Sequence, residues 1–286
     1  MSFSILDIKK KIYHEASMVF PTYFKNRDFE NVLKGLQNKH NVELLPEKEL
    51  LVLSFFAQKN WTVIDVGANN GLYSYFFKDI VKCSTVAAFE PLPNLYTKLK
   101  KWFTDVEIFP IALSNSTGKA TIHIPIINHN RYETRAKLDD LKEENETDRR
   151  ELQINIDTLD NIYHQQKWND VNFIKIDVEG HELGVIEGAQ EVIKKFNPFL
   201  LVEIEGRHHN NSVNEVVNRI CQFGYEAYFF NYTNKQISPF ALFDEATMQL
   251  SKNQNTFAYT NNFLFFPTEK KNKVEEINQK LKQFLQ

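Results

Sequence analysis

Titratable side chains gather in one short stretch of the chain, Phe173-Ile-Lys-Ile-Asp-Val-Glu-Gly-His-Glu182. Its apolar beginning predicts a buried strand, and Asp177, Glu179 and His181 follow the carboxyl end of that strand. Ligands of open α/β sheets bind at this edge. A carboxylate or an imidazole there can take the proton of a hydroxyl group. We therefore expect these three residues to be the catalytic groups. Each could instead complement the dipole of a helix N-terminus, which is the role expected for Glu182.

A glycine turn follows another buried strand in Val63-Ile-Asp-Val-Gly-Ala-Asn-Asn-Gly71. Gly67 lets the backbone approach a ligand, and Gly71 lets a helix begin close to the strand. The G-x-x-x-G spacing differs from the G-x-G-x-x-G that cradles a pyrophosphate, and Asp65 would repel such a group. The turn therefore predicts a nucleoside ligand that lacks phosphates and carries positive charge, as S-adenosyl-L-methionine does. A plain strand–turn–helix joint is the alternative.

Two further strand ends complete the predicted nucleoside site. Glu90 follows the predicted strand Thr85–Phe89, at the position where α/β nucleoside sites place an acid for the ribose hydroxyls. An exposed acid at a strand end is the alternative, but its agreement with the glycine turn favours ribose binding. Ser114, at the next strand end, lies on the side expected for adenine.

Acidic and imidazole side chains also end the following strand, in Val202-Glu-Ile-Glu-Gly-Arg-His-His209. Asp177, Glu203 and His208 could converge on a divalent metal that orients a sugar diol. These three residues are the candidate metal ligands.

The elements that must position these residues alternate between strands and helices. Seven strands predict a mostly parallel, doubly wound α/β sheet with helices on both faces. They are Trp61–Val66, Thr85–Phe89, Val106–Leu113, Asn172–Ile176, Phe199–Ile204, Glu226–Asn231 and Asn262–Phe266. The last two are joined by a long loop and could pair antiparallel. Helices are expected at Gly71–Lys82, Asn94–Phe103, Glu182–Phe196 and Ser212–Phe223, the last with a capping box of Ser212 and Glu215.

The predicted domain, residues 61–268, has additions at both ends. Residues 1–60 have helical periodicity, and 269–286 predict a helix with an apolar stripe of Val274, Ile277, Leu281 and Phe284. This stripe could pack on its own domain, form a dimer seam, or lie on a membrane surface.

A charged insertion interrupts the domain at residues 127–152. Fourteen of the 21 residues from Arg131 to Glu151 are charged. One interpretation is a solvated helix or a mobile excursion, and the other is a lid over the acceptor site. An extra strand is expected just before it, at Ala120–Ile126.

Composition limits the class of protein. The 286 residues carry a net charge of −3, which argues against a nucleic-acid partner. Cys83 and Cys221 are too far apart for a CxxC motif, which suits a reducing cytoplasm. No apolar run predicts a signal peptide or a membrane span.

Six motifs in this order resemble the FkbM family of methyltransferases, from about Val63 to Glu205: DVGANNGLYS, AFEPLPNLYTKL, ALSNSTGKATI, IDTLDNI, FIKIDVEGHELGVIEGA and PFLLVEIEG. The resemblance implies a class I methyltransferase (Rossmann-like) fold, S-adenosyl-L-methionine as methyl donor, and O-methylation, commonly of sugars or polyketides. It also implies roles for matched positions: Asp65, Gly67, Asn69 and Gly71 in the donor loop, Glu90 at the ribose, and Asp177-Val-Glu-Gly as the family signature. His181 stands where many members have a small residue.

Within the family, the chain is similar to bacterial O-antigen sugar methyltransferases of the Ogawa-serotype type. The expected function is therefore O-methylation of a sugar hydroxyl in a surface glycan, with a glycan or lipid-linked polysaccharide as acceptor. The expected location is the cytoplasm, with peripheral contact at the inner membrane and homo-oligomers left open. The alternatives are an O-methyltransferase of a polyketide or other secondary metabolite, a nicotinamide-dependent sugar oxidoreductase, and a non-catalytic glycan-binding relative. The spacing of the glycine turn and the presence of Asp65 count against the oxidoreductase.

Overall fold

The computed structural model describes residues 13, 15–127, 130–138, 142, 145–208, 212–250 and 259–286, without the side chains of Asn130, Arg131, Thr134 and His208. Among these residues no helix is both long and apolar enough to cross a membrane.

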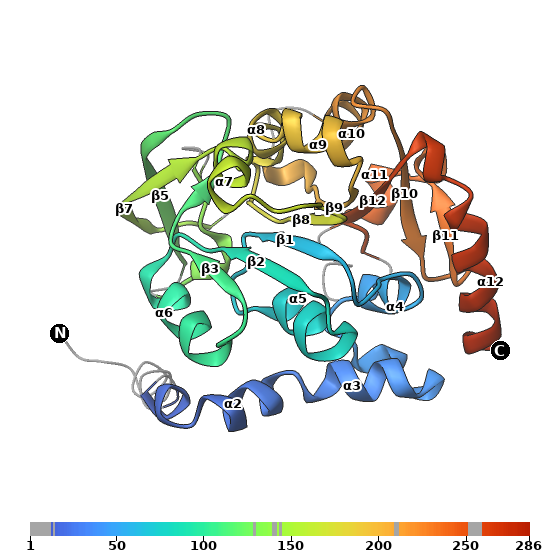
Figure 1. Cartoon of the computed structure of the whole chain (residues 1–286), viewed down its shortest axis with the longest axis horizontal. Helices are drawn as coiled ribbons and strands as arrows, with labels where there is room; N and C mark the ends of the chain where they lie inside the picture. The colour runs from blue at the N-terminus through green and yellow to red at the C-terminus, as the bar shows by residue number, and fades with distance from the viewer. Residues whose placement is uncertain are drawn as a thin grey trace.

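An eight-stranded sheet forms the middle layer of the molecule (Figure 1). From one edge to the other its strands are β11 (Gln236–Pro239), β10 (Tyr225–Asn231), β12 (Asn262–Pro267), β9 (Phe199–Glu203), β8 (Phe173–Ile176), β1 (Thr62–Val66), β2 (Thr85–Phe89) and β3 (Glu107–Phe109). The five strands from β9 to β3 are parallel to one another. β12 is antiparallel to both β9 and β10, and β11 is antiparallel to β10.

This sheet confirms the predicted mostly parallel α/β fold and the antiparallel pairing of β10 with β12. The predicted number of seven strands is wrong by one, because β11 adds an eighth strand at the edge. β11 has only four residues and ends in a proline, so its alternation is a weak signal in the sequence. It is fixed partly by a side chain distant in sequence, since the Ile237 N–H donates to Asn278 Oδ1 at 2.7 Å.

Helices cover both faces of the sheet (Figure 1). One face carries α7 (Leu159–Gln166), α8 (Glu182–Glu187), α9 (Gln190–Phe196) and α10 (Val213–Cys221). The other face carries α4 (Glu49–Ser54), α5 (Leu72–Tyr75), the π-helical turn η2 (Phe76–Val81) and α6 (Pro93–Trp102). α2 (Pro21–Asp28) and α3 (Glu30–Gln37) lie outside this second layer, and the predicted capping box of Ser212 and Glu215 begins α10.

Strand alternation divides the side chains of the sheet between two apolar cores. On β1, Val63 is buried in the core under α4 and α5, whereas Ile64 is buried in the core under α8 to α10. Asp65 points to the same side as Val63, and it pairs in register with Lys175 on β8. Two charged residues of buried strands therefore face the layer of α4 and α5.

A separate four-stranded sheet leans on α6 and has the order β4 (Ala112–Leu113), β7 (Asp148–Asp157), β5 (Gly118–Ile127) and β6 (Asn130–Arg131). The predicted strand Val106–Leu113 is divided between the two sheets at Pro110, which lacks the N–H needed to continue a ladder. The expected extra strand is confirmed as β5. The prediction of a solvated helix or mobile excursion is wrong for the last residues of 127–152, because β7 begins at Asp148. The described part of 127–152 contains only one helical turn, η3 (Glu133–Arg135).

The predicted helix Glu182–Phe196 is interrupted at Gly188, where α8 ends and α9 soon begins. A Cβ at position 188 would lie 1.9 Å from the backbone oxygen of Ser114. The chain needs glycine here because α8 ends directly against the strand end that carries Ser114.

The additions at both ends pack on the core under α4 and α5. Val32 of α3 and Leu50 of α4 are fully buried there. α12 (Lys273–Leu285) buries Ile277 and Leu281 in the same core, with Val274 and Phe284 packed against it. The C-terminal apolar stripe therefore packs on its own domain, the first of the three roles predicted for it.

Candidate active site

The glycine turn joins two strand ends at the carboxyl edge of the sheet. Gly67 has φ +77°, and both Gly67 and Ala68 donate backbone N–H groups to Phe89 O at 3.0 Å. A Cβ on Gly67 would lie 1.8 Å from the backbone oxygen of Asp177. The turn thus requires glycine, and it brings the loop after β1 against the end of β8.

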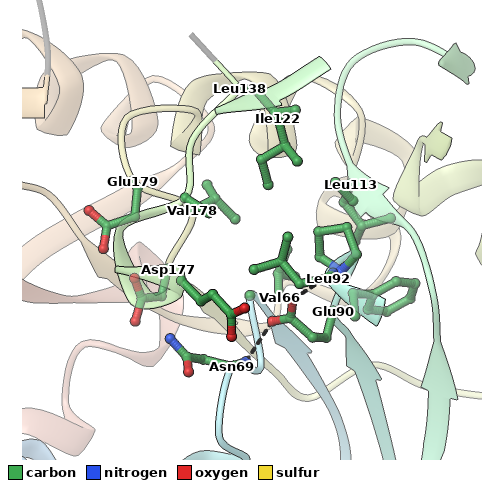
Figure 2. A pocket seen from close by; sticks show the side chains of 16 residues that line it. Val66, Asn69, Glu90, Leu92, Leu113, Ile122, Leu138, Asp177, Val178 and Glu179 are labelled. Atoms are coloured by element: carbon green, nitrogen blue, oxygen red, sulfur yellow. Dashed lines mark hydrogen bonds between the residues drawn. The ribbon is translucent and has the colours of Figure 1, made fainter. Parts of the chain in front are cut away.

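Glu90 holds this turn from the end of β2. Its Oε2 accepts the Asn69 N–H at 2.8 Å, and its Oε1 accepts the Leu92 N–H at 2.9 Å (Figure 2). Burial raises the pKa of Glu90 to about 7, and the two backbone hydrogen bonds oppose that rise. Asn69 has φ +48°, a left-handed conformation that asparagine tolerates well. Both residues lie where the sequence predicted a donor site.

A pocket opens beside Glu90, and its walls are mostly apolar with a few polar groups, as is typical of small-molecule sites. Gly67, Asn69 and Glu90 line it together with Asp177 and Glu179. Figure 2 shows Glu90 across the pocket from Asp177 and Glu179. Apolar side chains close the remaining walls: Val66, Leu92, Leu113, Ile122, Leu138 and Val178. A flat apolar ring and a polar sugar would find suitable partners in this nucleoside pocket.

The charged insertion contributes to the same pocket. Glu133, Ala136 and Leu138 line it, together with Ile122 of β5. This wall favours the lid interpretation of 127–152, which remains a prediction. Residues 128–129, 139–141 and 143–144 of that range lie outside the described part of the chain.

Asp177 and Glu179 approach the pocket from a tight turn after β8. Glu179 and Gly180 both have left-handed backbones, with φ +51° and +103°. A non-glycine residue in this region is uncommon and marks a functional constraint more often than chance. Glu182 stabilises the turn, since its Oε1 accepts the Gly180 N–H at 2.9 Å. Figure 2 shows the carboxyl groups of Asp177 and Glu179 on the same side of the pocket.

A second pocket, the acidic pocket, adjoins the first and shares Gly67, Asn69 and Asp177 with it. The residues that line only the acidic pocket come from the N-terminal addition, the glycine turn and the two buried strands: Asp28, Phe29, Pro46, Glu47, Asp65, Ala68, Asn70, Leu72, Tyr73 and Lys175. Asp65 accepts the Ser74 hydroxyl at 2.6 Å, and burial raises the pKa of Asp65 to about 6.

Lys175 is the buried cation of this region, with only 1% of its surface exposed. Its Nζ donates to Asn262 Oδ1 at 2.8 Å and lies 3.8 Å from both Asp177 Oδ2 and Glu203 Oε2. Burial alone would lower the pKa of Lys175, but the surrounding carboxylates raise it above its ordinary value. Burial, and then the charge of Asp177, raise the pKa of Glu203 well above its usual range.

Lys175 bears directly on the predicted metal site. Its ammonium group lies 3.8 Å from both Asp177 and Glu203, so a divalent cation placed between these two carboxylates would meet a buried positive charge. Among the described residues, no three His, Cys, Asp or Glu side chains are grouped so as to hold a metal ion. The side chain of His208 lies outside the description. The contact with Lys175 counts against Asp177 and Glu203 as metal ligands, and the predicted set that includes His208 stays a prediction.

His181 and Ser114 pair with each other, with Ser114 Oγ 2.9 Å from His181 Nε2. Neither is among the residues that line the two pockets. The imidazole packs closely over Gly184, where a Cβ would lie 2.4 Å from Nε2. The structure thus places Asp177 and Glu179 at the pocket and gives His181 and Ser114 a position beside it.

The sequence prediction missed Lys175, Glu47 and Tyr73. Lys175 was visible as a charged residue inside an otherwise apolar strand, Phe173-Ile-Lys-Ile176. A buried lysine requires carboxylate partners, and Asp65 in the neighbouring buried strand was a candidate. Nothing in the sequence around Glu47 pointed to a site. Helical periodicity predicts the helices of the N-terminal addition, but it does not show which carboxylate in a loop between them reaches a pocket.

Solved structures similar to this chain include several methyltransferases. A methyltransferase FkbM from Methylobacillus flagellatus KT is 14% identical over 84% of this chain and 59% of its own length, with a TM-score of 0.46. The chain thus spans about three fifths of the length of that protein. A TehB-like SAM-dependent methyltransferase from Corynebacterium glutamicum ATCC 13032 Kitasato is 10% identical over 76% and 84% of the two chains, with a TM-score of 0.39. The plantazolicin methyltransferase BamL, solved with SAH, is 11% identical over 90% and 97%, with a TM-score of 0.39.

No curated protein matches this chain. The family model described as the methyltransferase FkbM domain matches residues 65–227, more than half of the chain. The match includes the glycine turn, Glu90 and the Asp177-Val-Glu-Gly turn, and it confirms the family predicted from the motifs. The chain belongs to the FkbM methyltransferase family.

Proposed function

We propose that this chain is an S-adenosyl-L-methionine-dependent O-methyltransferase that acts on a sugar hydroxyl of a surface glycan, such as a lipopolysaccharide O-antigen. One observation carries the donor assignment: Glu90 is buried in the nucleoside pocket, against a glycine turn that permits close backbone approach. Each carboxyl oxygen of Glu90 accepts one backbone N–H and keeps a further lone pair for a ribose hydroxyl.

The two joined pockets suit the donor's shape and charge. The nucleoside pocket offers Glu90 to the ribose and Leu92, Leu113 and Ile122 to the adenine ring. The acidic pocket offers carboxylates to a positively charged end. A pyrophosphate would meet Asp65 and Asp177 there, which counts against a nicotinamide cofactor. When bound, the donor supplies a methyl group on a sulfonium, which is already a good leaving group.

The task left to the protein is to align the acceptor hydroxyl and to remove its proton. Asp177 lines both pockets and is 28% exposed, so its carboxylate is accessible to an acceptor. We assign Asp177 as the general base, with Glu179 as the neighbouring carboxylate that orients the hydroxyl. Glu179 and Glu133 present acceptor oxygens to the nucleoside pocket from the turn and from the charged insertion. Sugar hydroxyls donate readily to such groups.

Calorimetry tests the donor assignment. Wild-type protein should bind S-adenosyl-L-methionine or its demethylated product, S-adenosylhomocysteine, and should not bind NAD. Glu90→Gln should weaken donor binding by roughly 1–3 kcal/mol, because it removes a charged acceptor of the ribose hydroxyls. The expected dependence on pH follows from the pKa of about 7 for Glu90. Because the ribose hydroxyls donate to the ionised carboxylate, affinity should be full above pH 7 and should fall as the pH drops below it, by up to about tenfold per unit.

Glu90→Gln should lack this pH dependence, which separates Glu90 from other acids of the site such as Asp65. Tight binding of NAD with no response to the sulfonium compound would refute the donor assignment. An unchanged affinity in Glu90→Gln would remove Glu90 from the site.

A further inference from the structure

Glu47 belongs to the N-terminal addition, outside residues 65–227 that match the family domain. It lies between two anchored segments. Leu45 and Leu50 are buried in the core under α4 and α5, and Lys48 Nζ donates to Tyr259 O at 2.6 Å. A short loop held at both sides places its side chains reproducibly. Glu47 is therefore a fixed part of the wall of the acidic pocket.

The hydrogen bonds of Glu47 use only one of its carboxyl oxygens. Oε2 accepts the Tyr73 hydroxyl and, at 3.5 Å, the Asn262 amide. Oε1 accepts no hydrogen bond within the part of the chain described, and it is not among the buried atoms that lack a partner. A ligand in the acidic pocket can therefore reach a carboxyl oxygen of Glu47 without breaking an existing bond.

The charges of this pocket are not balanced by the protein. Four acids line it, against the single ammonium of Lys175: Asp28, Glu47, Asp65 and Asp177. The Lys175 ammonium also contacts Glu203 and Asn262, which do not line the acidic pocket. Burial raises the pKa of Glu47, with Lys175 and the Tyr73 hydroxyl opposing the rise. An incoming cation would relieve the repulsion among these acids and would favour the ionised form of each.

We propose that Glu47 binds the α-ammonium group of the donor's amino-acid end, and that the N-terminal addition thereby selects ligands that carry this group. The assignment rests on the proposed function. A ligand whose nucleoside occupies the pocket at Glu90 crosses the turn at Gly67 and Asn69, the residues that the two pockets share. Its other end then enters the acidic pocket. Ammonium is the group that matches a carboxylate with a free oxygen.

Two probes separate this contact from the nucleoside contacts. S-adenosylhomocysteine carries the amino-acid end, whereas methylthioadenosine lacks it. Wild-type protein should prefer S-adenosylhomocysteine. Glu47→Gln should lower the affinity for S-adenosylhomocysteine roughly tenfold to hundredfold, as expected for the loss of a charge-assisted hydrogen bond. The affinity for methylthioadenosine should be unchanged. Glu43→Gln, which alters an exposed acid in the preceding helical turn, should change neither affinity.

The possible results distinguish the two claims. Binding of neither nucleoside by the wild type refutes the proposed function itself. Binding of both with equal affinity, or an unchanged preference in a folded Glu47→Gln, overturns only the role of Glu47. Should Glu47→Gln fail to fold, Glu47→Asp keeps the charge but withdraws it by one methylene. It should lower the affinity for S-adenosylhomocysteine alone, and an unchanged preference would overturn the proposal.

Discussion

Replacing Asp177 by Asn is expected to lower turnover about 100-fold or more, because it removes the carboxylate that we propose takes the acceptor proton. The variant should still fold and bind the donor, because the two side chains have nearly the same shape. Losses of melting temperature and donor affinity should be smaller than the loss of turnover, and they reflect the ion pair with Lys175 and the charge of the acidic pocket. Asp177 lines both pockets and follows a strand that is buried throughout. Its contribution is therefore to the chemical step more than to the core.

The measurement is turnover with labelled donor, next to thermal melting and donor calorimetry. Asp105→Asn is a suitable control, because Asp105 is a largely exposed acid before β3, at the opposite edge of the sheet. Near wild-type turnover in a folded Asp177→Asn protein would make Asp177 structural. The base would then have to be Glu179 or Glu203, or His181 reached after a rearrangement.

Gly67→Ala is expected to remove donor binding and to destabilise the fold by about 2–4 kcal/mol. The added Cβ would lie 1.8 Å from Asp177 O, a backbone atom that cannot rotate away, at a φ of +77°. Either the turn or the end of β8 must move, and the nucleoside pocket is built between them.

Gly224→Ala is the matched control for this change. Gly224 has a similar φ of +92°, but a Cβ there would meet nothing within 4 Å. It should cost only the strain of the left-handed backbone, about 1–2 kcal/mol, and should leave donor affinity intact. Equal melting temperatures for the two variants would contradict the close approach at Gly67.

The central part of the fold and site was predictable from local signals. Buried strands ended by glycine, acid or proline mark the carboxyl edge, where Asp65, Gly67, Glu90 and Asp177 were expected and now lie close together. Because neighbouring strands of a parallel sheet run in the same direction, their carboxyl ends lie at one edge of the sheet. The capping box of α10 was equally local, because it depends on two residues three apart.

Features that depend on distant contacts were not predictable. β7 consists largely of polar residues from a charged stretch, and it forms a strand because β5 pairs with it over nine positions. The break at Gly188 depends on the approach of Ser114 O from another sheet. The contact of the His181 ring with Ser114 also depends on a residue distant in sequence, and the catalytic role of His181 stays a prediction. Lys175 Nζ lies 3.8 Å from both Asp177 and Glu203, two of the predicted metal ligands, and this contact depends on side chains of neighbouring strands.

The central claim is methyl transfer to a sugar oxygen, and mass spectrometry of surface glycan from cells with and without the gene tests it most directly. A sugar O-methyltransferase should leave a methyl ether on one hydroxyl, so glycan from cells with the gene should be heavier by one CH₂ unit per modified sugar. The Asp177→Asn gene should not restore this mass to the deletion strain. Glycan of unchanged mass, or glycan lighter by a pair of hydrogens as sugar oxidation would leave it, would contradict the account.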